Sequence, residues 1–458
     1  MNSTPLATVI IVNYNGAHLL PDCLRALDRQ HADAAAFETV VVDNASSDGS
    51  CELLARDFPW VNVIESPRNL GFAGGNNLAL REVTTPYAVL LNNDASPEPG
   101  WLRNLLATLE GPDGQDVGIA TGKILFLPKF VRVELRTPAF RPGPQDTREL
   151  GVRVYGVSVD GADVTDKVLW EQAAYGPEGA GPGRFRWTRP SGQFLLPVPP
   201  ALCGGDRVTH PVKVTITVMA QTAKELTLVV DGRPIDTRVD TRPMDVEFEV
   251  TAGAHVVDVI NNAGGIVLRD GSGADRGFQE VDVGQYDLPG EVFTACGNGM
   301  ALRTAVGRDL GWFDDVFFMY YEDTDLSWRW RSRGWTIRYV PSAVLRHIHA
   351  ASSKEWSPRW IFHVERNRLL MLTKNATSAL AWSAVRSYLR HTAVGLTRAG
   401  LGAARQRRRP ALREHLLRLS ILRSYLRQAP RALRERRALR RNAVVSAAEL
   451  ETWLVTRR

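Results

Sequence analysis

The sequence predicts an α/β protein: a mostly parallel sheet flanked by helices, with an inserted all-β sandwich and a basic helical C-terminal region. Short apolar runs alternate with helical patterns early in the chain, period-two alternation dominates the middle, and arginine-rich helical patterns end it. Strands that alternate with helices are typical of parallel sheets covered by helices. Because 458 residues exceed what one hydrophobic core usually serves, we expect more than one folding unit.

Changes in hydrophobic periodicity and charge divide the chain into four segments. We expect the halves of one α/β domain at residues 1–129 and 257–375, the β-sandwich insert at 130–256 and the basic helical tail at 376–458. In the first half, the strands are expected in ATVIIVNYN, TVVVDN, VNVIES and YAVLLNND. In the insert, the Asp-Gly pairs at 160–161 and 231–232 predict hairpin turns.

Composition excludes several classes of protein. No apolar run reaches about 18 residues, so we expect no membrane-spanning helix. The N-terminus lacks the basic start and apolar stretch of a secretion signal. Four scattered cysteines suit neither a disulfide framework nor a zinc site, so the sequence predicts a cytoplasmic protein.

The charge of the chain is uneven. The net charge is +6, but Arg386–Arg458 alone carries 19 Arg and 4 Glu, or +15, which leaves −9 for the rest. A basic tail with leucines at helical spacing predicts peripheral binding to an anionic membrane at its inner face. Nucleic-acid binding is not expected, because stacking aromatic residues are sparse there. The alternative is a helical cap or a homo-oligomer contact.

Polar residues follow two of the predicted strands. Asp43 ends one apolar strand, and Asn92, Asn93 and Asp94 follow another. Ligands of open α/β sheets bind at such carboxyl ends, and oxygen ligands there suit Mg²⁺ or Mn²⁺ on a diphosphate. The alternative is ordinary turn chemistry without a ligand.

Three further motifs are candidate site elements. The glycine-rich loop Asn69–Asn77 lets backbone approach a ligand closely, or is simply a flexible loop before a helix. Asp323, at a helix start, suits a general base for an alcohol, although the helix dipole alone would explain an acidic residue there. His347 follows a strand and is either a ligand or a structural histidine.

Taken in order, these motifs resemble a family 2 glycosyltransferase of GT-A fold, closest to the rhamnosyltransferase-like branch that builds cell-surface and cell-wall polysaccharides. The resemblance covers roughly half of the chain, and it is carried by these stretches: VIIVNYNGAHLLPDCLRAL, VVVDNASSDGS, NLGFAGGNN, LLNNDASPEPGWL, CGNGMALRTAVGRDLGWFDDVFFMYYEDTDLSWRWRSRGW and YVPSAVLRHIHAAS.

The resemblance implies a role for each matching position. Residues 1–129 would bind the nucleotide and residues 257–375 would serve the acceptor and catalysis. Asp323 would be the catalytic base, and Asp94 and His347 the metal-binding residues. The implied donor-binding residues are Asn13, Asp43, Asn69, Gly71, Asn77 and Asn93. Asn92 departs from the fuller acidic pattern of the family's metal motif.

The expected activity is therefore metal-assisted, inverting transfer of rhamnose or a similar hexose. The donor would be a dTDP-, UDP- or GDP-sugar, the acceptor a glycan or polyprenyl-linked glycan, and the cofactor Mn²⁺ or Mg²⁺. Two rivals remain, a nucleotidyltransferase on the same sheet and a non-catalytic glycan-binding protein with a decayed transferase core. The insert is either a carbohydrate-recognition sandwich or a packing or oligomerisation module.

Overall fold

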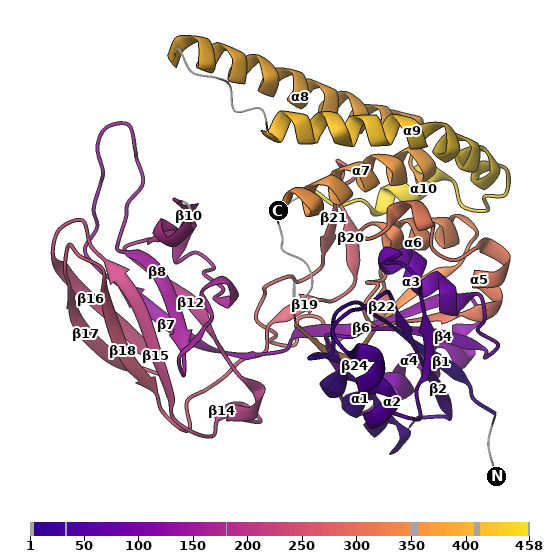
Figure 1. The fold of residues 1–458 in the computed structure, drawn as a ribbon, viewed down its shortest axis with the longest axis horizontal. Helices are drawn as coiled ribbons and strands as arrows, with labels where there is room; N and C mark the ends of the chain where they lie inside the picture. Colours follow the sequence, from indigo (N-terminus) through magenta and orange to yellow (C-terminus); the bar gives the residue numbers. More distant parts are fainter. Residues whose placement is uncertain (1–3, 33, 180, 349–355, 407–412, 457–458) are drawn as a thin grey trace. The chain divides into compact units, whose positions relative to one another are not determined.

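The computed structural model describes residues 4–32, 34–179, 181–348, 356–406 and 413–456 (Figure 1). The chain forms two compact units. The α/β unit comprises residues 1–125, 261–278 and 284–458, and the sandwich unit comprises residues 126–260 and 279–283. The predicted α/β class, with a helix-flanked sheet and additional antiparallel sheets, is confirmed.

The central sheet of the α/β unit runs in the order β22-β24-β6-β23-β4-β1-β2-β3, with β19 paired to β6 and β5 to β24. Its parallel part is β4-β1-β2-β3, and β23 joins β4 and β6 antiparallel. The strands of this sheet are β1 (Ala7–Asn13), β2 (Phe37–Asp43), β3 (Asn62–Glu65), β4 (Tyr87–Asn92), β5 (Ala95–Pro97), β6 (Val117–Phe126), β19 (Ile260–Asn262), β22 (Gly290–Glu291), β23 (Met300–Arg303) and β24 (Thr336–His347). A small separate sheet pairs β20 (Gly265–Val267) with β21 (Gly273–Asp275).

Helices pack on both faces of the parallel part. Val9 and Ile11 share a hydrophobic core with the leucines of α1 and α4, whereas the next residue, Val12, faces Gly75 of α3. Successive strand residues point to opposite faces, so β1 carries apolar residues on both faces because both are covered. The helices of the first half are α1 (Leu20–Asp28), α2 (Ser50–Asp57), α3 (Gly71–Leu80) and α4 (Trp101–Glu110).

The second half adds the helices that continue into the tail. They are α5 (Thr304–Leu310), α6 (Glu322–Ser332), α7 (Pro358–Asn375), α8 (Ser378–Gln406), α9 (Arg413–Arg441) and α10 (Ala447–Leu450). The predicted tail at 376–458 groups with the α/β unit, because α9 packs along α7 and α8 and buries Ile421 and Tyr425 (Figure 1). None of the described helices is long and apolar enough to cross a membrane.

The sandwich unit consists mainly of two antiparallel sheets around a valine-rich core. One contains β8 (Arg153–Val159), β9 (Ala162–Asp163), β10 (Ala174–Glu178), β11 (Phe185–Thr188), β15 (Val212–Met219) and β18 (Met244–Val250). The other contains β7 (Lys129–Arg136), β12 (Ser191–Val198), β16 (Lys224–Val230) and β17 (Arg233–Val239). A two-stranded ribbon pairs β13 (Cys203–Gly204) with β14 (Arg207–Val208).

The sandwich unit is wider than the predicted insert at 130–256. Phe130 pairs with Val257, and Val259 pairs with Val281, so residues 257–260 and 279–283 join the unit. The sequence does not reveal these pairings, because single bridges leave no alternating pattern. The short 3₁₀ helices of the chain are η1 (Arg29–Ala32), η2 (Pro112–Gly114), η3 (Thr165–Lys167), η4 (Gly181–Gly183), η5 (Pro200–Leu202), η6 (Asp315–Phe317) and η7 (Glu451–Trp453).

Candidate active site

The strands β1, β2 and β4 end at one edge of the sheet and bring their polar last residues together. The register pairs Asn13 with Asp43, and Val12 with Asn92. The chain turns directly after β4, which places Asn93 and Asp94 at the same edge. Apolar strands that stop in register therefore create a polar edge from residues far apart in sequence.

A chain of hydrogen bonds fixes the side chains of this edge. The Asn93 amide donates to Asn13 Oδ1 at 2.8 Å, and Asn13 Nδ2 donates to Asp43 Oδ2 at 3.3 Å. The other Asp43 oxygen, Oδ1, accepts from the backbone N–H of Ser46 at 2.8 Å. Because Asn13, Asp43 and Asn93 are all buried, these bonds orient the edge before any ligand arrives.

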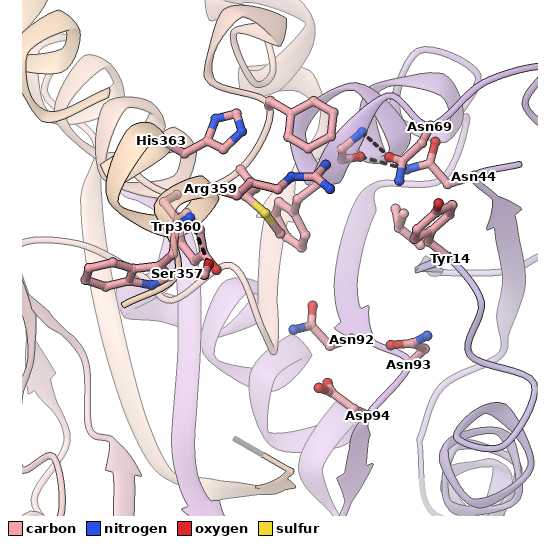
Figure 2. Close-up of a pocket in the computed structure, with 16 residues that line it drawn as sticks. Tyr14, Asn44, Asn69, Asn92, Asn93, Asp94, Ser357, Arg359, Trp360 and His363 are labelled. Carbon is pink, nitrogen blue, oxygen red and sulfur yellow. Dashed lines mark hydrogen bonds between the residues drawn. The ribbon is translucent and has the colours of Figure 1, made fainter. Parts of the chain in front are cut away.

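A cavity of about 260 Å³ opens at this edge (Figure 2). Of the predicted site residues, Asn69, Gly71, Asn93 and Asp94 line it, while Asn13 and Asp43 lie behind Asn93. The lining residues are Val12, Tyr14, Asn44, Asn69, Gly71, Phe72, Asn92, Asn93, Asp94, Phe318, Met319, Tyr320, Ser357, Arg359, Trp360 and His363. The cavity is thus built from both sequence halves of the α/β unit.

Asp94 and His347 form the candidate metal pair. Asp94 Oδ1 lies 3.2 Å from His347 Nε2, and antiparallel pairing of β5 with β24 places them, with the Ile348 N–H donating to the Asp94 carbonyl at 3.0 Å. On the other side of the imidazole, His347 Nδ1 is 3.3 Å from Asn261 Oδ1. Apart from this ion pair with His347, the buried Asp94 Oδ1 makes no hydrogen bond within the described part of the chain.

These two residues fit a metal that is shared with a ligand better than a metal held by protein alone. Among the described residues, no cluster of three His, Cys, Asp or Glu side chains could hold an ion. Mg²⁺ commonly takes one or two protein carboxylates and completes its shell with water and phosphate oxygens. A buried carboxylate paired with an imidazole fits such an arrangement.

The glycine-rich loop forms another side of the cavity. Asn69 Oδ1 accepts from the Gly71 N–H at 2.8 Å, and Asn44 holds the loop by accepting from the Leu70 N–H at 2.8 Å. Gly71 has φ +72°, and a Cβ there would lie 2.4 Å from the Phe318 carbonyl oxygen. Glycine is needed here for both the backbone conformation and the close approach.

Asn77, predicted to line the donor pocket, is not among the lining residues. Its Nδ2 donates to the Phe313 carbonyl at 2.8 Å and to Asp315, and its Oδ1 accepts from the Phe313 N–H at 3.2 Å. The structure therefore uses Asn77 to anchor the segment that enters η6.

Asp323 lies in the first turn of α6, close to the cavity but not on its lining. Asp323 Oδ2 accepts from the Gly297 N–H at 3.0 Å, and Oδ1 from the Thr324 N–H at 2.6 Å. Gly297 also faces the ring of Phe72, which lines the cavity. Burial raises the pKa of the Asp323 carboxyl above its usual range, and the two backbone hydrogen bonds only partly oppose this.

The start of α7 supplies lining residues to which the sequence reasoning gave no role. Figure 2 shows Ser357, Arg359, Trp360 and His363 reaching the cavity from this helix. The His363 ring stacks on Phe318 with centroids 5.2 Å apart, and Arg359 lies over the same Phe318 ring at 5.4 Å. Burial and the nearby Arg366 and Arg359 lower the pKa of His363 to about 4, so the imidazole is neutral at pH 7. The available signal was a helix start carrying arginine, tryptophan and histidine together.

Parts of the chain are similar in sequence to known glycosyltransferases. A relative in Haloferax volcanii, the glycosyltransferase AglE, is 31% identical over 123 residues, which cover 26% of this chain and 40% of the relative. The N-acetylglucosaminyl-diphospho-decaprenol L-rhamnosyltransferase of Mycobacterium tuberculosis is 40% identical over 57 residues, 12% of this chain and 19% of the relative. The chain thus spans less than half the length of either relative.

Similarity to solved structures is more distant. A mannosyltransferase from Pyrobaculum calidifontis, solved with GDP-Man and Mn²⁺, matches with a TM-score of 0.39 and 15% identity over 99% of this chain and 88% of that one. At this TM-score the similarity carries no conclusion about function.

Two family models match separate parts of the chain. The model for glycosyl transferase family 2 matches residues 8–155, and the model for glycosyl transferase family group 2 matches residues 256–409. The matched regions include the polar sheet edge and the start of α7, so both sides of the cavity fall within them. The chain belongs to the family 2 glycosyltransferases.

Proposed function

We propose that this protein transfers a sugar from a nucleotide-diphosphate donor to a glycan or polyprenyl-linked acceptor, with inversion at the sugar carbon. The observation that carries the proposal is the cavity at the polar sheet edge, where the buried Asp94 carboxylate lies against His347 and makes no hydrogen bond through Oδ1. A preorganised oxygen ligand at a strand end suits the diphosphate of such a donor.

The donor side consists of groups that are already oriented. The nucleotide would lie between the edge made by Asn13, Asp43 and Asn93 and the loop that contains Asn69 and Gly71. Asp43 and Asn13 stand behind this surface and hold the Asn93 amide in place. Arg359, which is exposed at the cavity, adds a positive charge for the donor phosphates.

Mn²⁺ or Mg²⁺ would be held by Asp94 and His347. When bound, the ion supplies positive charge to the departing diphosphate. Asn92, which also lines the cavity, offers an amide oxygen rather than a second carboxylate. We therefore expect an exchangeable ion that binds together with the donor.

Asp323 would remove the proton of the acceptor hydroxyl. Its raised pKa makes the ionised carboxylate a stronger base, and the Gly297 and Thr324 N–H groups hold its oxygens in a defined orientation. Inverting transfer needs a base and a stabilised leaving group but no covalent nucleophile. A sugar such as rhamnose is supported by the partial match to the mycobacterial rhamnosyltransferase.

A thermal-shift panel tests the proposal. We expect one of the dTDP-, UDP- or GDP-sugars to raise the melting temperature when Mn²⁺ is present, because a ligand that binds only the native state stabilises it. The matched control is Asp94→Ala, which should lose the Mn²⁺-dependent part of the shift. A panel in which no nucleotide sugar stabilises the parent protein would contradict the proposal.

We also propose that the tail binds an anionic membrane at its inner face, close to a lipid-linked acceptor. On α9, Leu419, Leu426 and Leu433 recur every seven residues and stay exposed, whereas Ile421 and Tyr425 on the other side are buried. Arginines border the exposed leucines, as in a helix that lies in a membrane interface. Residues 407–412, which carry three of the tail arginines, lie outside the described part of the chain.

Vesicle sedimentation with the full chain tests the membrane proposal. Leu426→Glu should weaken binding to anionic vesicles at low salt, because it places a negative charge in the exposed leucine row. Leu288→Glu is the control, since Leu288 is 84% exposed but lies outside the tail. If the parent protein does not sediment with the vesicles, the tail serves protein packing instead.

A further inference from the structure

The segment 316–321, called here the wall, has an uncommon backbone. Phe318, Met319 and Tyr320 of this segment line the cavity. Phe318 has φ +65°, and Tyr320 and Tyr321 both have φ +69°. Aromatic residues rarely adopt this left-handed region, and such conformations persist only where surrounding groups hold them.

The turn at Phe318 is the sharpest part of the wall. The Met319 N–H donates to the Phe317 carbonyl at 2.8 Å, and Phe318 between them has φ +65° and ψ −61°. This is a γ-turn of the rare positive-φ kind, which is strained relative to ordinary turns. The local sequence contains no glycine or asparagine that would favour it.

Two neighbouring side chains of α7 hold the wall from behind. The Asn367 amide nitrogen lies 2.8 Å from the Phe317 carbonyl oxygen, 2.9 Å from that of Met319 and 2.8 Å from that of Tyr320. The buried Arg366 guanidinium donates to the Val316 carbonyl at 2.8 Å and to the Phe317 carbonyl at 3.1 Å.

Arg366 also fixes which way the Asn367 amide points. Its Nε donates to Asn367 Oδ1 at 2.9 Å, which leaves the amide nitrogen facing the three wall carbonyls. Asn367 is fully buried, and so is its contact with the Phe317 carbonyl, whereas its contacts with the Met319 and Tyr320 carbonyls are partly buried. An unsatisfied buried carbonyl is costly, and the pair therefore satisfies the wall and shapes it.

The wall contacts the glycine-rich loop and also leads into α6, which carries Asp323. The Phe318 carbonyl accepts from the Ala73 N–H of α3 at 3.1 Å and sits against Gly71 of the glycine-rich loop. At its other end, the wall runs directly into α6, whose second residue is Asp323. A displaced wall would move the donor loop and the candidate base together.

We propose that Asn367 is a positioning residue, supported by Arg366, that holds the wall in the conformation that binds the donor and presents Asp323. This inference rests on the proposed function for its effect on turnover, whereas its effect on the wall itself does not. Neither side chain needs to touch the sugar nucleotide to act in this way.

The experiment compares Asn367→Asp, Asn367→Ser and the control Thr373→Val in the full chain. Aspartate keeps the size of asparagine but turns the donor into an acceptor that faces three carbonyls. Serine keeps one donor. Thr373 is buried on the same helix, and its hydroxyl lies 2.9 Å from that of Tyr425, on the side of the tail. It therefore controls for a general loss of α7 packing.

Two readouts separate the wall from the activity. We expect amide hydrogen exchange of residues 318–323 to accelerate by about tenfold in Asn367→Asp and less in Asn367→Ser, with β1 and β4 unchanged. Donor affinity, measured by the nucleotide-sugar thermal shift, should weaken about tenfold in Asn367→Asp, with kcat lowered as well. Thr373→Val should change neither readout.

Unchanged exchange in the wall of a folded Asn367 variant would overturn the positioning role. An equal loss in Thr373→Val would overturn it too, because general destabilisation would then suffice. If the aspartate variant does not fold, the serine variant decides by the same criteria. If the parent binds no nucleotide sugar although the wall exchange follows our expectation, the proposed function fails and the holding role of Asn367 stands.

Discussion

The two sides of the cavity are built by different means. At the sheet edge, Asn13 and Asp43 end paired strands and Asn93 directly follows a third, so strand pairing and one short turn bring them into contact. At the wall, Phe318 and Tyr320 adopt left-handed conformations that side chains from a distant helix stabilise. The comparison teaches that a regular sheet can position one side of a cavity through strand pairing, whereas an irregular segment needs side chains from another helix to hold it.

The two sides also differ in how their charges are satisfied. Asp43 is buried with both carboxylate oxygens accepting hydrogen bonds. Glu322, where the wall meets α6, is buried with Oε2 unbonded within the described part of the chain, and its pKa lies well above the usual range because of burial and the neighbouring Asp323. Burial thus disfavours the charged form of Glu322, whereas hydrogen bonds satisfy both carboxylate oxygens of Asp43.

The sharpest test of this division is Asp323→Asn. We expect kcat to fall by about 10²–10⁴-fold, the usual contribution of a general base, with donor affinity little changed because the sheet edge is untouched. Steady-state kinetics together with donor thermal shifts measure the two effects. Full turnover in this variant would favour the nucleotidyltransferase rival, and an equal loss of donor affinity would indicate a structural role.

On the sheet side, Asp94→Ala should lower divalent-ion-dependent turnover about 10–100-fold. The reason is that Asp94 supplies the carboxylate of the candidate metal pair with His347. Turnover titrated with Mn²⁺ is the measurement, and Asp22→Ala, an exposed carboxylate on α1, is the control. Undiminished turnover at saturating Mn²⁺ would mean that the metal assignment is wrong.

The contact between the glycine-rich loop and the wall can be tested with alanine variants of two glycines. Gly49 and Gly71 both have positive φ, at +83° and +72°, but only Gly71 has a neighbour within 4 Å of its virtual Cβ. Gly49→Ala should therefore cost about 1 kcal/mol of unfolding free energy, the usual cost of that conformation. Gly71→Ala should cost about 2–3 kcal/mol more, because the Cβ meets the Phe318 carbonyl.

Urea unfolding of the two variants measures the difference. Gly71→Ala should also weaken the donor-induced thermal shift, since either the loop or the wall must move. Equal unfolding free energies for both variants would show that the loop and the wall are not in firm contact.

The sheet side could be predicted from the sequence because it follows from local patterns. Asp43 ends one apolar strand, and Asn92–Asp94 follow the apolar residues of another, so the polar residues show where these strands end. Parallel pairing then brings the two ends to the same edge of the sheet. Asn77 shows the limit of that logic. Its partners Phe313 and Asp315 lie more than 230 positions away, so the sequence could not show that the amide was already engaged.

The wall could not be predicted for a related reason. Nothing in the local sequence favours positive φ at Phe318, and the groups that enforce it lie about 50 positions along the chain, in Arg366 and Asn367. The sequence predicts the helices of the tail from their periodicity, but not which face of α9 packs inward. That face is set by distant contacts, such as the ion pair between Glu435 of α9 and the buried Lys374, which also pairs with Asp314.

The smallest effect we expect comes from Glu322→Gln, which sharpens the contrast in charge. A carboxyl whose pKa is raised on folding contributes stability below its unfolded pKa and loses it as pH rises through the folded pKa. The parent protein should therefore lose stability relative to the glutamine variant as the pH rises through the raised pKa of Glu322. Melting temperatures of both proteins from pH 5 to pH 9 measure the difference, and the exposed Glu52→Gln on α2 is the control. If the melting temperatures of the parent and the Glu322→Gln variant changed in parallel over this range, the pKa of Glu322 would not be raised by folding. The contrast in charge between Glu322 and Asp43 would then be wrong.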